Sequence, residues 1–161
     1  MSDVAGTGGT SYPTDGVAFN HIGLCVTDLE RARAFYEGAL GFKSWWGFDV
    51  PDQGTATLLG LQPPLGLHAA YMVRDGLVLE LLYYSQGEHP QPRPRAMDEP
   101  GLTHISVAVQ DIPAALERVR QLGGDVLEGS NVGAGIMVRD PDGQLVELTT
   151  WDWLSRLPPR P

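Results

Sequence analysis

MVRDGLVLEL (Met72–Leu81) and MVRDPDGQLVEL (Met137–Leu148) are near copies of each other within one chain of 161 residues. A second matched pair lies upstream of them, HIGLCVTD at His21–Asp28 and HISVAVQD at His104–Asp111. Each copy therefore opens with a histidine and closes with a glutamate inside an apolar segment. The chain is a tandem duplication, so the fold of one half predicts the fold of the other.

Alternating apolar residues, helix caps and turn residues define the elements of the first copy. Asp28 is expected to be the N-cap of a helix over residues 29–40, where apolar residues recur at helical spacing. Strands are predicted at Val17–Val26, Phe42–Val50, Thr55–Leu59, Leu67–Val73 and Leu77–Tyr84.

The second copy repeats this order. A helix begins at Asp111 and ends at Gly123–Gly124, with Pro113 acceptable in its first turn. Strands are predicted at Leu102–Val109, Asp125–Glu128, Gly135–Arg139 and Gln144–Thr150. Apart from the additional short strand at Thr55–Leu59 in the first copy, each copy is therefore a β-α-β-β-β module, and the fold class is α+β.

The modules account for most of the chain. We predict a disordered tail over residues 1–16, a first module over 17–84, a proline-rich linker over 85–100, a second module over 101–151 and a C-terminal tail over 152–161.

The bulk composition restricts the partners and the compartment. Asp and Glu number 20 against 11 Lys and Arg, which gives a formal net charge of −9. No basic stripe is visible, so neither nucleic acid nor an anionic membrane surface is an expected partner. The apolar runs are too short to span a membrane, and one cysteine excludes an internal disulfide. We expect a cytoplasmic protein.

Strand parity separates two faces at the start of each copy. In the first copy Ile22, Leu24 and Val26 share a face and are large enough to pack on the helix, whereas His21 shares the other face with small residues. The second copy repeats this arrangement around His104. Small residues beside a histidine leave room for a ligand.

Two carboxylates fall inside predicted strands whose other residues are mostly apolar and are therefore expected to be buried. Glu80 lies between two leucines, and Glu147 occupies the equivalent position in the second copy. A buried carboxylate without a partner costs several kcal/mol, so each needs the same kind of partner. A divalent metal ion shared with His21 and His104 would satisfy both, and we regard these four residues as candidate metal ligands.

Two motifs carry a family resemblance. The segment from His21, H-I-G-L-x-V-x-D-L-E-x-A-x-x-F-Y-x-x-x-L-G-F, and the segment Asp140–Leu148, D-P-D-G-x-x-x-E-L, resemble the vicinal oxygen chelate superfamily. That superfamily includes glyoxalase I, methylmalonyl-CoA epimerase, extradiol dioxygenases and the bleomycin- and fosfomycin-resistance proteins. The resemblance covers roughly residues 17–151 and is nearest in pattern to glyoxalase I and the epimerase. It implies paired βαβββ modules that form a cupped, mostly antiparallel mixed sheet around a central metal site, and a homodimer.

In the resemblance the family's ligand positions fall on His21, Glu80, His104 and Glu147. Two imidazoles and two carboxylates leave open positions on a divalent transition metal such as Fe, Mn, Co, Ni or Zn. Such an ion stabilises the enolate or enediolate of a small oxygenated substrate. Glu147 or Glu80 is then the candidate base. We expect a metal-dependent isomerase, epimerase or lyase.

Two alternatives stay open. The same ligands could hold Fe(II) in an extradiol-type dioxygenase, or the chain could be a metal-free protein that binds a small molecule or a drug. Within the enzyme class, glyoxalase I has a glutathione-binding Arg where this chain has Cys25, and an Asn where it has Tyr84. Both departures argue against a glutathione adduct as the substrate.

Several other residues receive non-catalytic interpretations. Cys25 is expected to line a cavity, His68 to line the core or a pocket, and His89 to be solvated. Asp140 and Asp142 are expected to form a turn. Six aromatic residues are enough to line an apolar pocket, although at strand positions they fit a core equally well; they are Trp45, Trp46, Phe48, Tyr71, Tyr83 and Tyr84.

Overall fold

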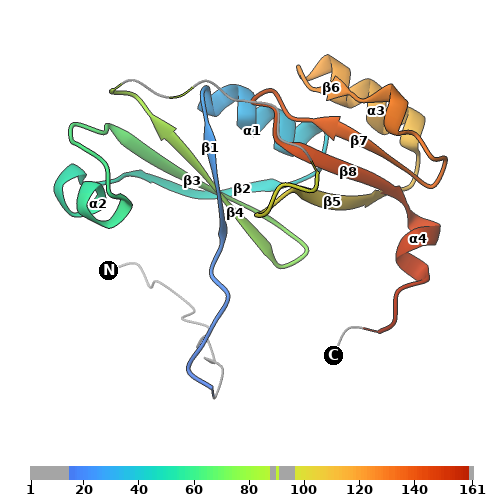
Figure 1. Ribbon diagram of the computed structural model, residues 1–161, viewed down its shortest axis with the longest axis horizontal. Helices are drawn as coiled ribbons and strands as arrows, with labels where there is room; N and C mark the ends of the chain where they lie inside the picture. Colours follow the sequence, from blue (N-terminus) through green and yellow to red (C-terminus); the bar gives the residue numbers. More distant parts are fainter. Residues whose placement is uncertain (1–14, 88–89, 91–96, 160–161) are drawn as a thin grey trace, which may run out of the picture.

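The computed structural model describes residues 15–87, 90 and 97–159. Most of the predicted N-terminal tail, the middle of the predicted linker and His89 lie outside the described residues. Within them the chain forms two modules that lie next to each other along the long axis of the molecule (Figure 1).

The first module is a four-stranded mixed sheet with helices. Its elements are β1 (Ile22–Val26), α1 (Leu29–Gly38), β2 (Lys43–Asp49), α2 (Asp52–Leu59), β3 (Leu67–Arg74) and β4 (Leu77–Tyr84). The strand order is β1-β4-β3-β2, in which β1 pairs with β4 in parallel and the other pairs are antiparallel.

The second module repeats this plan in a separate sheet. Its elements are β5 (His104–Val109), α3 (Ile112–Gln121), β6 (Asp125–Val126), a 3₁₀ turn η1 (Glu128–Ser130), β7 (Gly135–Arg139) and β8 (Leu145–Thr150). The order β5-β8-β7-β6, with β5 and β8 parallel, matches that of the first sheet. The predicted α+β fold of two βαβββ modules is confirmed.

The same device starts the main helix of each module. The side chain of Asp28 accepts a hydrogen bond from the backbone N–H of Arg31, and the side chain of Asp111 accepts one from Ala114, each at 2.9 Å. Both aspartates have extended backbone dihedrals, as an N-cap requires. The predicted caps are confirmed, and each turns the chain from the first strand into the helix.

One predicted strand is wrong. The segment Thr55–Leu59 belongs to α2, because helix-terminal signals on both sides outweigh its β-branched residues. Asp52 supplies a negative charge to the first turn, and Gly60 ends the helix in a left-handed conformation with φ +67°. The helix buries only Ala56, which packs with Leu65 and Leu67 at one end of the first sheet. A further helix, α4, spans Trp151–Ser155 and so begins at the last residue of the predicted second module and continues into the predicted C-terminal tail.

A single apolar core joins the two modules. Its buried residues come from α1, α3 and both sheets, and include Phe35 and Val119. The main helices approach closely: a Cβ built on Gly38 of α1 would lie 2.6 Å from Cδ1 of Leu122, and one built on Gly124 would lie 2.6 Å from Cε2 of Phe35. The modules of one chain are therefore held together on their helical side, whereas α2 packs on one end of the opposite face of the first sheet.

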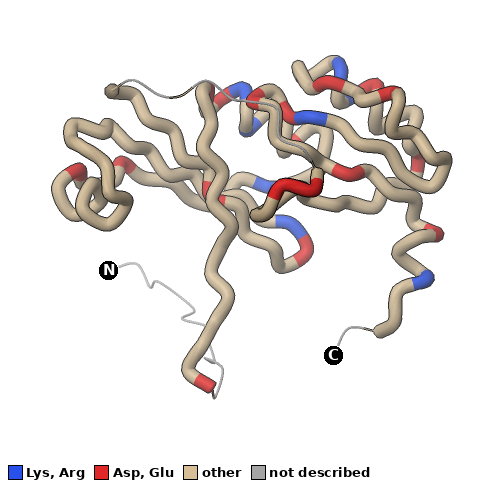
Figure 2. Tube along the Cα trace, in the orientation of Figure 1, with Lys and Arg blue, Asp and Glu red and all other residues tan. Residues whose placement is uncertain are grey.

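Charged residues are spread over the described surface. Figure 2 shows the Lys and Arg residues distributed over α1, α3, the β3–β4 hairpin and the C-terminal segment, interspersed with Asp and Glu. In the described part of the chain no helix is long and apolar enough to cross a membrane.

Candidate metal half-sites on the two sheets

His21 and Glu80 lie together on the face of the first sheet that turns away from α1. The register pairs Gly23 of β1 with Glu80 of β4, so His21 is the diagonal neighbour of Glu80 across a parallel strand pair. His21 Nε2 lies 2.9 Å from Glu80 Oε2, and the Glu80 side chain is 13% exposed. His21 Nδ1 is buried without a hydrogen-bond partner.

Tyr71 is a second partner of Glu80. Its hydroxyl donates to Glu80 Oε1 at 2.5 Å from the directly opposite position on β3. Burial and this hydrogen bond raise the pKa of Tyr71 to about 12, so the hydroxyl stays protonated and remains a donor.

The sequence interpretation missed this role, although the sequence carries the signal. A two-residue turn at Asp75-Gly76, both with positive φ, fixes the hairpin register and places Tyr71 opposite Glu80.

His104 and Glu147 form the equivalent pair on the second sheet. Ser106 of β5 is in register with Glu147 of β8, so His104 has the same diagonal relation to its glutamate. The contact is looser: His104 Nε2 lies 3.8 Å from Glu147 Oε2, and the Glu147 side chain is 36% exposed. Ser106 Oγ donates to Glu147 Oε2 at 2.7 Å.

The two halves supply their hydroxyl donors from opposite sides. Glu80 has a tyrosine on one neighbouring strand and Gly23 on the other, whereas Glu147 has Ser106 on one and Met137 on the other. Each glutamate therefore receives one hydroxyl, and Glu80 is held more tightly.

Each pair fits one side of a divalent ion. Two ligand atoms at about 2.1 Å from a metal and at right angles to each other are about 3 Å apart. The separation of 2.9 Å in the first pair matches this spacing, and the wider second pair requires the exposed Glu147 side chain to move. An imidazole and a carboxylate are a donor set that transition metals accept.

Within one chain the four predicted ligands form two pairs and not one cluster. Among the described residues no group of three or more His, Cys, Asp and Glu side chains is arranged to hold a metal ion. A protein metal site normally has at least three ligands from the protein. Each pair is therefore a half-site.

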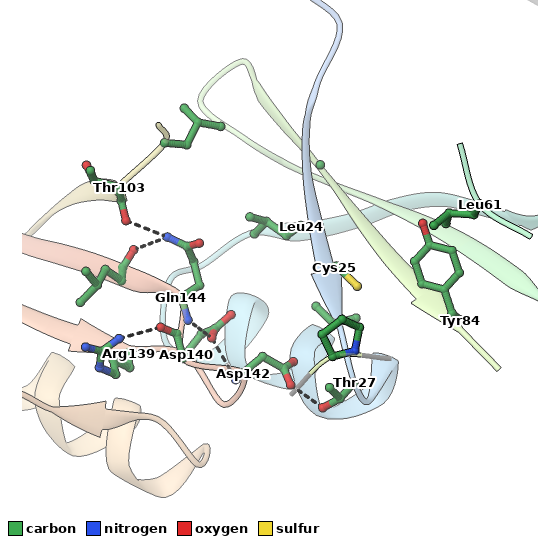
Figure 3. A pocket seen from close by; sticks show the side chains of 16 residues that line it. Leu24, Cys25, Thr27, Leu61, Tyr84, Thr103, Arg139, Asp140, Asp142 and Gln144 are labelled. Carbon is green, nitrogen blue, oxygen red and sulfur yellow. Dashed lines mark hydrogen bonds between the residues drawn. The ribbon is translucent and has the colours of Figure 1, made fainter. Parts of the chain in front are cut away.

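A cleft between the modules does not include either pair. It has a volume of about 760 Å³ and is lined by residues of both modules, among them Cys25, Tyr84, Thr103 and Gln144 (Figure 3). Burial, followed by the charge of Asp142, raises the pKa of the Cys25 thiol. Cys25 thus lines a cavity and is not activated as a nucleophile.

The turn between β7 and β8 lines this cleft and contacts the first module. Asp140 Oδ1 accepts from the backbone N–H groups of Asp142 and Gln144, which makes the turn expected from the sequence. In addition, Tyr36 of α1 donates to Asp140 Oδ2 at 3.0 Å, and Arg31 of α1 lies 3.0 Å from Asp142 Oδ1. These contacts between modules were not visible in the sequence, because they join residues more than 100 positions apart.

His68 is not part of either half-site. Its Nδ1 lies 2.8 Å from Asp49 Oδ1, and the two residues are in register across β2 and β3. It lines a small surface depression with Thr27 and Tyr83.

The family model of the glyoxalase/bleomycin resistance protein/dioxygenase superfamily matches residues 18–148 of the chain. The chain belongs to this superfamily. The superfamily assignment confirms the resemblance read from the sequence motifs.

Relatives in sequence are lyases and epimerases of this superfamily. The chain is 31% identical over 134 residues to the lactoylglutathione lyase of Salmonella typhimurium, which covers 80% of the chain and 88% of that enzyme. It is 28% identical over 162 residues to the human mitochondrial methylmalonyl-CoA epimerase, covering 86% of the chain and 81% of that enzyme. The match to the Arabidopsis thaliana lactoylglutathione lyase GLX1 is 29% identical over 141 residues and covers 83% of the chain, but the chain spans only 44% of the length of that relative.

Solved structures of the superfamily share the fold. A glyoxalase family protein from Bacillus cereus superposes with a TM-score of 0.67 at 18% identity, covering 82% of the chain and 92% of that protein. The fosfomycin resistance protein FosX from Listeria monocytogenes superposes with a TM-score of 0.58 at 22% identity, covering 88% of the chain and 98% of FosX.

Proposed function

We propose that the chain is a metal-dependent isomerase, epimerase or lyase that removes a proton next to a carbonyl group of a small oxygenated substrate. The observation that carries this proposal is the repeated histidine–glutamate pair, which occurs at the same register position on both sheets. The relatedness to a lactoylglutathione lyase and a methylmalonyl-CoA epimerase supports the same reaction class.

A complete site requires a second copy of the chain. The helical sides of the two modules are joined within one chain, and the two half-sites do not meet there. In a two-fold dimer, the His21–Glu80 pair of one copy would face the His104–Glu147 pair of the other, and symmetry would give two identical sites. All four predicted ligands would then serve one ion, which is a transition metal such as Fe, Mn, Co, Ni or Zn. A FosX structure from Listeria monocytogenes contains Mn(II).

The bound ion would act as a Lewis acid toward two neighbouring oxygens of the substrate and so favour loss of the adjacent proton.

The two glutamates have different roles in this proposal. Glu80 is mostly buried, contacts His21 and accepts the Tyr71 hydroxyl, so it is the fixed ligand. Glu147 is more exposed and farther from its histidine, so it can swing toward the substrate, take up the proton and return it. The Ser106 hydroxyl either stays hydrogen-bonded to Glu147 during this movement or forms the hydrogen bond again when Glu147 moves back.

Two features bear on the substrate. Cys25 and Tyr84 both line the cleft beside the first sheet, and burial, Cys25 and Glu80 raise the pKa of Tyr84. They occupy the positions at which glyoxalase I has its Arg and Asn. A substrate without the glutathione carboxylates is therefore favoured.

Metal content tests the proposal without knowledge of the substrate. Purified protein reconstituted with Mn(II) or Zn(II) should hold about one equivalent per chain by elemental analysis. His104→Ala and Glu80→Gln should each lower this content strongly, whereas His68→Ala, which removes a histidine outside the half-sites, should not. Absence of metal after reconstitution, or its retention in both ligand variants, would overturn the proposal and favour the metal-free binding protein.

A further inference from the structure

A group of aromatic side chains lies on the same face of the first sheet as His21 and Glu80. It consists of Trp45, Trp46, Phe48 and Tyr71, and is called the aromatic wall below. The rings of Trp46, Phe48 and Tyr71 are stacked, with interplanar angles of 24° for Trp46–Phe48, 22° for Trp46–Tyr71 and 2° for Phe48–Tyr71. Trp45 meets Tyr71 edge-on at 6.4 Å.

A β-bulge produces this arrangement. Ser44 is in register with Met72 and Trp46 with Tyr71, so Trp45 is an extra residue in β2. In a regular strand, two consecutive tryptophans would point to opposite faces. The bulge lets both reach Tyr71, although they remain 64% and 57% exposed. Large aromatic surfaces are normally buried on folding, so this exposure marks a surface suited to a ligand.

The aromatic wall is continuous with the first half-site. The ring of Tyr71 stacks on Trp46, its edge meets the His21 ring at 5.7 Å, and its hydroxyl binds Glu80. A ligand held at the metal by two oxygens would therefore lie beside the wall. At the other end of this face α2 packs on Leu67 and contacts Leu82 and Tyr84, which limits the space available there.

The net charge of the chain favours a neutral ring at the wall. The formal net charge of the chain is −9. A nucleotide ring would bring phosphates toward this negative charge, whereas an uncharged arene would meet only the flat apolar rings.

We propose that the aromatic wall binds the arene of the substrate, and that the substrate class is an aryl-substituted compound with vicinal oxygens, joined to the ring by a short linker. This inference rests on the proposed function, because it takes the His21–Glu80 pair as the place where the oxygens bind.

A matched pair of probes tests this inference. Pyruvate and phenylpyruvate carry the same vicinal oxygens and differ only by the ring. Titration calorimetry with Mn(II)-loaded protein should give at least about tenfold tighter binding of phenylpyruvate, since stacking adds to the burial of the ring. Trp46→Ala should remove this preference and leave pyruvate binding unchanged. Trp153→Ala provides the control, because Trp153 is an exposed tryptophan on α4, outside the wall.

The outcomes separate the wall from the metal site. Equal binding of the two probes by the Mn(II)-loaded protein would overturn the inference while the metal site stands. If the protein binds no metal even after reconstitution, the proposed reaction is rejected. If that metal-free protein still prefers phenylpyruvate to pyruvate, and Trp46→Ala loses this preference, the arene site is supported. Tighter binding of AMP than of phenylpyruvate, also lost in Trp46→Ala, would overturn the substrate class. Loss of dimerisation in Trp46→Ala, with no ring preference in the wild type, would identify the wall as a subunit contact and overturn the inference.

Because Trp46 is largely exposed, its removal leaves the core intact. Equal melting temperatures of the wild type and Trp46→Ala would check this. The variant Trp46→Phe, which keeps a flat ring, should restore part of the preference; a Trp46→Phe protein no better than Trp46→Ala would contradict stacking as the cause.

Discussion

At the scale of single residues, Asp140 shows how one buried carboxylate makes folding depend on pH. It is 4% exposed, and burial raises its pKa above the ordinary value of 3.8 despite hydrogen bonds from Gln144, Tyr36 and Asp142 that lower it. The folded chain therefore binds this proton more tightly than the unfolded chain. The contribution of Asp140 to stability is largest below pH 3.8 and is lost as the pH rises through the raised pKa.

Asp140→Asn should remove this dependence. An asparagine oxygen can still accept from the backbone of Asp142 and Gln144, while its amide group faces the Tyr36 hydroxyl, which can accept from it. We expect the stability of the variant, relative to the wild type, to rise as the pH increases from about 4 to about 7. Urea unfolding at several pH values measures this difference. A constant difference across that range would contradict the assignment.

At the scale of elements, the two N-caps provide an internal comparison. Asp28→Ala and Asp111→Ala should each lower the free energy of unfolding by about 1 kcal/mol, because each removes one hydrogen bond to the first turn of a helix. The caps lie in different modules, so the effects should add in the double variant. Asp28→Ser, which can still cap, is the control. Chemical unfolding followed by circular dichroism compares these four variants with the wild type, and a clearly non-additive double variant would contradict independent capping.

Most elements could be predicted from the sequence because their signals are local. The strands of the internal repeat, the two caps and the faces of the first strands all follow from local spacing, as the exposed Gly23 and buried Val26 illustrate. The helix α2 could not be recognised from its central residues, since its terminal signals decide its conformation. The contact of Tyr36 with Asp140 could not be predicted either, because it depends on how the two modules pack. The candidate ligands could be named from the repeat, but not their separation into two pairs.

At the scale of the whole molecule, the proposed sharing of each metal site between two copies can be tested by mixing two variants. His21→Ala and His104→Ala proteins should each lose metal as homodimers. A heterodimer of the two would contain one site with both histidines removed and one site with both intact. A statistical mixture contains about half heterodimers, so about one site in four should bind metal. Co-refolding followed by metal analysis measures this fraction. Failure of the mixture to recover any metal would contradict a site shared between copies.

The unequal environments of Glu80 and Glu147 have a consequence for stereochemistry. Two identical halves would present an equally mobile carboxylate to each side of a flat enolate, so either carboxylate could act as the base. In this chain one carboxylate is fixed by Tyr71 and the other is free to move. With Glu147 as the base, protons would leave and return on a single side, and deuterium from heavy water would enter one prochiral position. The divergence of the two duplicated halves would thus restrict proton exchange to the side of the substrate that Glu147 faces.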